Sequence, residues 1–187
     1  MDALIARIQV RVSDPVKAVD AAAWVRPRPT IRPHATPAEI DAAEAALGFP
    51  IPVLLRRLYL EIGNGGFGPA YGLAGVPTIP PSPVTGDIVL LYTELLAAPP
   101  PDENPSWHWP PCVVPLIALG CDIWECVDFL NPPYPVVVSD PNEYDWEGTL
   151  AEQLKPVAAS LSDRLETWLN VPPPRGSGRV KAARPPM

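Results

Sequence analysis

Proline is the residue that most limits what this chain can fold into. The sequence has 29 prolines among 187 residues. Proline fixes φ and has no backbone N–H donor, so it ends helices and interrupts central strands. Many of the prolines are clustered, at Pro99 to Pro101, at Pro110 and Pro111, at Pro132, Pro133 and Pro135, and at Pro172 to Pro174. The clusters predict short helices and strands separated by rigid loops.

Length and composition indicate one folded domain with terminal extensions. A hydrophobic fraction of 47 % suits a single core without metals or cross-links. The cysteines Cys112, Cys121 and Cys126 are interpreted as reduced thiols, which indicates a cytoplasmic protein. The chain begins with no signal-peptide pattern, and no uncharged stretch reaches the ~18 apolar residues that span a bilayer. We therefore expect a soluble protein without a membrane partner.

The acidic residues are distributed unevenly. No lysine or arginine occurs between Leu58 and Leu154, whereas thirteen Asp and Glu fall in this stretch. Acids that cannot pair within the stretch are expected at the surface, because burying an unpaired charge is costly. Charges of one sign repel nucleic acid and anionic membrane and attract basic partners. Solubility is the simpler alternative explanation of such acidity.

Two consecutive helices are the clearest local prediction. Thr36-Pro37-Ala38-Glu39 is a capping box with proline at the first helical position, and the helix that it starts should stop at Gly48. A second helix should end at Gly63-Asn64-Gly65-Gly66, where glycines accept positive φ. Its expected buried stripe is Ile51, Leu54, Leu55, Leu58 and Ile62.

The rest of the chain predicts strands before a last helix. Residues 1–25 are weakly helical, and 26–33 form an extended linker. A short strand is expected near 70–73, a helix capped by Asp87 over 88–97, a hairpin of strands 113–119 and 123–130, and a third strand over 135–139. Pro156 should start or kink the final helix, which carries Leu161, Leu165, Trp168 and Leu169.

This element order predicts an α+β fold with a mostly antiparallel sheet packed against helices. The expected organisation is an N-terminal helical extension and linker over 1–33, a folded domain over 34–170, and a disordered basic, Pro-rich tail over 171–187.

Several motifs in this order resemble one family. A capped helix ends in Leu-Gly and is followed by Phe49-Pro50-Ile51-Pro52, a Leu-rich helix and the Asn-Gly-Gly turn. Further matching pieces are Gly68-Pro69-Ala70-Tyr71-Gly72-Leu73, Trp109-Pro110, Val114-Pro115-Leu116 and the Gly-Cys-Asp turn before Val127-Asp128. Over roughly residues 36–170 the chain is similar to the SUKH superfamily, which includes the yeast cell-wall assembly regulator domain. The resemblance implies an α+β fold. It also implies a protein that, in bacteria, binds and blocks a cognate toxin, often a nuclease or deaminase.

Cysteine chemistry has weak support. Cys112 lies four residues after His108 and could act with it as a nucleophile and base, but it opens an apolar strand, where cysteine usually packs as a small hydrophobe. The three cysteines and His108 could bind zinc, but they contain no CxxC pair. We therefore predict no cofactor and no structural metal.

Two loops invite ligand-binding interpretations. The glycines at 63–66 close a helix, and the next lysine is Lys155, so they indicate a C-cap rather than a phosphate-binding loop. The acidic loop 140–147 could bind calcium weakly, but it lacks the EF-hand spacing. A solvated or partner-facing loop fits it better.

The sequence also gives little support to a glycosidase active site or a nucleic-acid-binding site. On a strand, Asp122 and Asp128 would share one face and Glu125 would point away, so no acid–base pair stands out. Trp107 and Trp109 could stack on bases, but no basic residue lies nearby.

We predict a non-enzymatic immunity protein that blocks a toxin one-to-one, with an acidic face that mimics a polyanion and occludes a basic cleft. The predicted contact residues are Asp122, Glu125, Asp128, Glu143, Asp145 and Trp146, with Trp107 and Trp109 as possible anchors. We expect a monomer or weak homo-oligomer with no nucleic-acid partner. A regulatory or scaffold domain that binds a non-toxic protein is the main alternative, and an enzyme of unknown type is the third.

Overall fold

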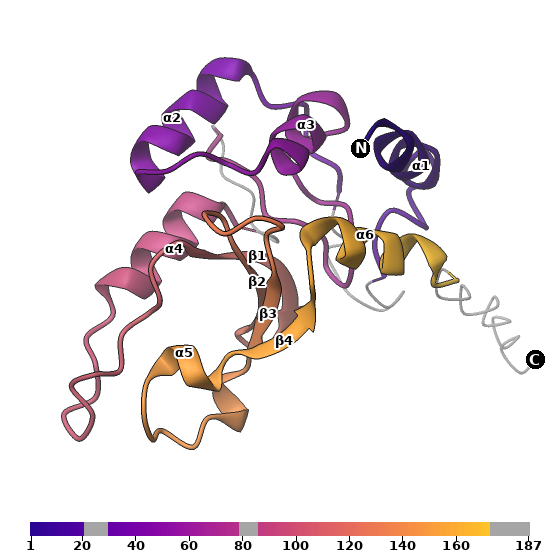
Figure 1. The fold of residues 1–187 in the computed structure, drawn as a ribbon. Coiled ribbons are helices and arrows are strands. Elements are labelled where there is room, and N and C mark those ends of the chain that lie inside the picture. Colours follow the sequence, from indigo (N-terminus) through magenta and orange to yellow (C-terminus); the bar gives the residue numbers. More distant parts are fainter. Residues whose placement is uncertain (21–29, 79–85, 173–187) are drawn as a thin grey trace, which may run out of the picture.

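A computed structural model describes residues 1–20, 30–78 and 86–172 (Figure 1). The helices are α1 (Asp2–Val12), α2 (Pro37–Leu47), α3 (Val53–Glu61), α4 (Ile88–Ala97), α5 (Leu150–Gln153) and α6 (Leu161–Asn170), with a 3-10 turn at Pro141–Glu143. The strands are β1 (Val113–Gly120), β2 (Ile123–Asp128), β3 (Val136–Ser139) and β4 (Lys155–Ala158). The fold is α+β with an antiparallel sheet, which confirms the predicted class.

The sheet is a meander in the order β1-β2-β3-β4. Cys121 and Asp122 join β1 to β2, and both have positive φ, at 53° and 61°. A two-residue turn of this kind matches the right-handed twist of its flanking strands, so it fixes the hairpin register. The three predicted strands are confirmed to within two residues at their ends.

The edge strand β4 is a correction to the sequence analysis. The prediction that Pro156 starts or kinks the final helix is wrong, because Lys155–Ala158 pairs with β3. Proline is tolerated there because an edge strand has one side without a partner strand. The final helix starts only after Ser160, whose Oγ accepts the backbone N–H of Asp163 at 3.0 Å. The short strand expected near 70–73 is also wrong, since only a single bridge from Leu73 to Ile117 forms.

The predicted helix caps are confirmed. Thr36 and Glu39 exchange the two hydrogen bonds of a capping box, at 3.2 Å and 2.7 Å, and Gly48 ends α2 with φ at 83°. The carboxylate of Asp87 accepts the backbone N–H of Leu90 at 2.8 Å. Each cap satisfies a backbone donor that the first turn of a helix leaves free, so these residues set where α2 and α4 begin.

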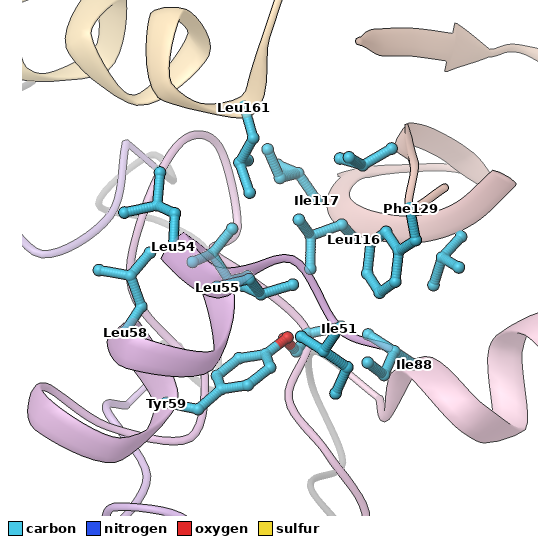
Figure 2. Close-up of a cluster of buried hydrophobic side chains, with 14 of the residues drawn as sticks. Ile51, Leu54, Leu55, Leu58, Tyr59, Ile88, Leu116, Ile117, Phe129 and Leu161 are labelled. Carbon is cyan, nitrogen blue, oxygen red and sulfur yellow. The ribbon is translucent and has the colours of Figure 1, made fainter. Parts of the chain in front are cut away.

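The main core lies between α3 and the sheet (Figure 2). The predicted stripe of α3 is buried, and Leu55 and Leu58 are fully so. Figure 2 shows these side chains in one cluster with Leu116 of β1, Phe129 after β2 and Leu161 of α6. At roughly 1.5–3 kcal/mol per fully buried large aliphatic side chain, this cluster supplies much of the free energy that holds the helices on the sheet.

The first helix belongs to the same core, although 1–33 is predicted to be an extension of the folded domain. Its residues Leu4, Ile5, Ile8 and Val12 are buried in the core cluster. Arg11 donates to the carbonyls of Trp168 and Val171, each at 2.9 Å, and its guanidinium lies 4.5 Å from the centroid of the Trp168 ring. These contacts hold α1 against α6. Figure 1 shows the two helices side by side.

Some predictions on the terminal segments cannot be compared with the structure. Residues 13–20 form turns rather than a continuation of α1. Residues 21–29 and the tail from 173 onward lie outside the described residues. They include half of the predicted linker 26–33 and most of the predicted tail 171–187.

Asn64 explains the turn that follows α3. Its side chain is fully buried, donates to the carbonyl of Val76 at 3.0 Å and accepts the backbone N–H of Val76 at 2.8 Å. The neighbouring Gly66 has φ at 80°, and a Cβ there would lie 1.9 Å from the carbonyl oxygen of Thr30. The turn thus needs an amide that both donates and accepts, next to a residue without a side chain.

Candidate functional site

A groove of about 470 Å³ lies beside α4 and is the candidate site. It is lined by residues of α4, of the loop 98–109, of one face of the sheet and of the segment 139–150. The floor of the groove is formed by Pro115 of β1, Trp124 of β2 and Ser139 of β3. Trp124 pairs directly with Ser139, and Cys126, two residues after Trp124 on β2, pairs with Pro115. Alternation along each strand brings the three floor side chains to one face.

The groove walls are aromatic. Four of the six tryptophans line it (Trp107, Trp109, Trp124 and Trp146), together with Tyr144. Trp107 and Trp146 stack at 5.0 Å between centroids, and Tyr144 meets them edge-on at 5.5 Å and 5.7 Å. Aromatic pairs in these geometries add roughly 0.5–1.5 kcal/mol each beyond their buried area. The cluster is therefore rigid enough to present a defined surface.

Hydrogen bonds fix the segment that carries Trp146. The side-chain amide of Asn104 donates to the carbonyls of Trp146, at 3.2 Å, and Gly148, at 2.8 Å. The hydroxyls of Ser139 and Tyr144 lie 2.5 Å apart. Trp146 itself has φ at 63°, a conformation that non-glycine residues adopt only when their surroundings hold them there. These contacts hold the Trp146 ring at the groove while about half of its surface stays exposed.

The groove is electronegative at its edge. Glu94 of α4 and Asp122 of the β1–β2 turn line it, and both are exposed. Neither carboxylate forms a hydrogen bond or an ion pair with the described residues. Of the thirteen acids between Leu58 and Leu154, only Glu61, Glu125 and Glu143 are in ion pairs with the described chain. The other ten form no ion pair there.

The cations of the described chain are used elsewhere. Each is in an ion pair except Arg32. Arg32 packs against Gly75 and donates from Nε to the carbonyl of Asn64 at 2.5 Å, and burial lowers its pKa. No described lysine or arginine lines the groove, so its carboxylates face solvent unneutralised.

Comparison with known families decides what kind of domain this is. The sequence profile of the SMI1 / KNR4 family (SUKH-1) matches residues 34–167. The chain belongs to this family. The match confirms the predicted resemblance. No curated protein matches the chain in sequence. SUKH domains are generally non-catalytic immunity proteins, and membership is consistent with such a role.

The structure brings four of the predicted contact residues of this SUKH domain together. Asp122, Trp107, Trp109 and Trp146 all line the groove. Trp107 and Trp109 are nevertheless buried, with 7 % and 8 % of their surface exposed, and the indole N–H of Trp109 donates to the carbonyl of Val113 at 2.6 Å. They build the wall rather than protrude as anchors. Among the groove tryptophans, Trp146 presents the most surface to a partner, at 51 % exposure.

Glu125 lies in the interior, away from the predicted contact surface. It is 5 % exposed, and its two carboxylate oxygens accept from Nε and Nη2 of Arg164 at 2.7 Å and 2.9 Å. Sequence reasoning treated Glu125 as an unpaired surface acid because no cation lies near it in the chain. The partner comes from α6, beyond the Lys- and Arg-free stretch, and a bidentate pair of this kind holds α6 on the sheet.

Asp128, Glu143 and Asp145 do not line the groove. Asp128 is half-buried and accepts the backbone N–H groups of Leu130 and Asn131. Glu143 is exposed and pairs with Lys155. Asp145 accepts the side-chain amide of Gln153 at 2.6 Å. Asp128 therefore stabilises the turn after β2, whereas Glu143 and Asp145 tie the loop after β3 to β4 and α5.

The lining residues that the sequence did not single out include Glu94, Trp124 and Tyr144. They belong to α4, β2 and the loop after β3, so only the folded sheet brings them together. The one available signal was strand alternation, which places Trp124 on the opposite face from Glu125.

The described residues contain no cluster of three or more His, Cys, Asp or Glu that could hold a metal ion. Cys126 is buried, Cys121 is exposed and Cys112 is intermediate. Burial raises the pKa of Cys126 and Cys112, and the nearby Glu125 and Asp128 raise them further, which disfavours the reactive thiolate. No helix in the described part of the chain is long and apolar enough to cross a membrane.

Proposed function

We propose that this SUKH domain is an immunity protein that binds a cognate toxin one-to-one and blocks it with the aromatic groove and its acidic surroundings. The observation that carries the proposal is the groove itself. It combines exposed aromatic surface with carboxylates that have no counter-charge in the described chain. Tryptophan and tyrosine are enriched among the residues that dominate binding energy at protein interfaces. Family membership supports the same role.

The toxin expected from this surface has a basic cleft, as nucleases do. Ten acids of the stretch 58–154 form no ion pair with the described chain. A one-signed surface attracts a cationic partner from a distance and raises the association rate, whereas short contacts in the groove would hold the complex. The proposed contact surface is Glu94, Asp122, Trp124, Glu143, Tyr144, Asp145, Trp146 and Glu147.

Four residues of the sequence-based surface are left out of this proposal: Glu125, Asp128, Trp107 and Trp109. Asp128 is half-buried and bonded within its own turn, and Trp107 is buried behind Trp146. The pair of Glu125 with Arg164 keeps that carboxylate in the interior. Trp109 is buried with its indole N–H satisfied. Substituting Glu125 or Trp109 would change folding rather than a direct contact.

The test is co-expression with candidate toxin domains from neighbouring genes, scored by growth and by co-purification. The wild-type protein should restore growth and co-purify in a 1:1 complex. Trp146→Ala should weaken both, because truncating a central interface tryptophan costs about 2 kcal/mol or more. Val10→Ala is the matched control, since Val10 is exposed on α1 and does not line the groove.

Failure of the wild-type protein to protect or to co-purify would contradict the toxin role. Stable capture of a non-toxic protein through Trp146 would instead favour a regulatory or scaffold domain.

A further inference from the structure

The geometry points to one occupant of the groove: an arginine side chain that the partner presents, stacked on tryptophan and paired with Asp122 and Glu94. This inference rests on the proposed function for the identity of the partner, but not for the chemistry of the site. Three observations carry it: accessible aromatic faces, unpaired carboxylates beside them, and no cation of the described chain within the groove.

The aromatic faces can take a cation. Trp146 is half-exposed and Trp124 is half-buried, whereas Trp107 and Trp109 are covered. Trp107 stacks on Trp146 at an interplanar angle of 27°, so one face of the Trp146 ring is occupied from behind. A cation within about 6 Å of a tryptophan ring is attracted by the negative potential of its face, and tryptophan is the best of the aromatic side chains for this.

The two carboxylates reach the groove from different elements. Asp122 sits in the left-handed β1–β2 turn and Glu94 lies on α4. Neither has a hydrogen-bond donor in the described chain to satisfy it. A guanidinium offers five N–H donors in one plane, so it can stack on an indole and still donate to carboxylates at its edge. An ammonium is a point charge with a tighter hydration shell, which makes lysine the poorer fit.

Other occupants fit the charges less well. A phosphate or a nucleic acid needs cations, and the groove has none among the described residues. A purely apolar segment would cover Asp122 and Glu94 without pairing them, and burying unpaired charges is costly. Arginine uses both the rings and the carboxylates.

The probes are three capped tripeptides, acetyl-Gly-X-Gly-amide, in which X is arginine, lysine or citrulline. Citrulline has nearly the shape of arginine but no charge. Binding to the full chain is followed by the NMR signals of the tryptophan indole N–H groups. The arginine peptide should bind saturably with a Kd on the order of 1 mM. It should bind at least about threefold more tightly than the lysine peptide, and the citrulline peptide should bind more weakly still.

Three variants locate the site. Trp146→Ala should weaken arginine binding about two- to fivefold, which corresponds to an exposed cation–π contact. Asp122→Asn and Glu94→Gln should each weaken it by a similar factor, and asparagine also tolerates the left-handed conformation of the turn. Glu103→Gln is the matched control, because Glu103 is exposed in the same acidic stretch and does not line the groove.

Equal binding of the citrulline and arginine peptides, or equal losses in Glu103→Gln and Asp122→Asn, would overturn the inference. So would an absence of any indole shift in wild-type protein. The toxin role fails separately: peptide binding without protection from the toxin contradicts the proposed function alone, and protection without peptide binding contradicts the arginine site alone.

Discussion

At the scale of single residues, two buried polar side chains specify this fold. Asn64 pairs with both backbone groups of Val76, and Glu125 pairs with Arg164. Neither residue could have been given its role from the sequence. Asn-Gly-Gly is typical of many turns, so the sequence does not reveal that the Asn64 side chain is buried. Arg164 lies far from Glu125 in the chain, and only the packing of α6 on the sheet brings the two side chains together.

Replacing Asn64 should strongly destabilise the protein. Asn64→Ala removes both partners of the buried N–H and C=O of Val76, and each unsatisfied buried group costs about 1–3 kcal/mol. We expect the free energy of unfolding to fall by about 2–4 kcal/mol in urea denaturation. Glu103→Ala, at an exposed position whose side chain bonds to none of the described residues, is the control and should change it by less than about 0.5 kcal/mol. Equal effects of the two substitutions would contradict this role for Asn64.

At the scale of elements, helix starts and turns could be predicted wherever a few neighbouring residues determine them. The capping box at Thr36, the Asp87 cap and the Cys121-Asp122 turn each follow from a few neighbouring residues, and each is present. β4 could not be predicted, because its three sheet-edge residues Lys155 to Val157 are exposed and include a proline. Packing on β3, not propensity, makes that segment a strand.

The pair of Glu125 with Arg164 should be essential for holding α6 on β2. Arg164→Ala leaves a buried carboxylate unpaired, and we expect a loss of about 3–5 kcal/mol in the free energy of unfolding. The double variant Glu125→Leu, Arg164→Leu should recover most of this loss, because it removes the stranded charge. Urea denaturation of the three proteins measures it. A double variant as unstable as Arg164→Ala would show that the cost lies in packing rather than charge.

Acid should weaken the contact of α1 with α3. Arg57 hydrogen-bonds Glu61 and Asp2, and these bonds lower the pKa of both carboxyl groups below their usual 4.5 and 3.8. A lowered pKa in the folded state means that the stabilisation is present above the unfolded value and is lost as pH falls through the folded value. Asp2 is the partner on α1, so Asp2→Asn should lower Tm at pH 7 but not near pH 2. A Tm difference that is independent of pH would contradict this assignment.

At the scale of the whole molecule, the family and fold class follow from the sequence, but the site does not. Four residues predicted from the sequence as partner contacts line the groove: Asp122, Trp107, Trp109 and Trp146. That a partner touches them stays a prediction. The sequence does not single out Glu94, Trp124 and Tyr144 as site residues. They come from α4, β2 and the loop after β3, and these segments become neighbours only in the folded protein. Most of the acids in the stretch 58–154 are not paired with a cation, as the sequence predicts. Only three of the thirteen form an ion pair with the described chain.

Salt and charge should control how fast the toxin is captured. Glu143 and Glu147 are exposed beside the groove segment, and neither side chain is needed for the hydrogen bonds that hold Trp146. Replacing both by lysine should slow association and make it less sensitive to salt, with a smaller change in dissociation. Val10→Ala is the control, because it leaves every charge in place.

The association rate constant for the cognate toxin domain, measured by stopped flow between 50 mM and 500 mM salt, tests the central claim most directly. An acidic face that captures a basic toxin predicts a rate that falls steeply with salt in the wild type and less steeply in the variant Glu143→Lys, Glu147→Lys. A wild-type rate that does not change over this range would contradict it.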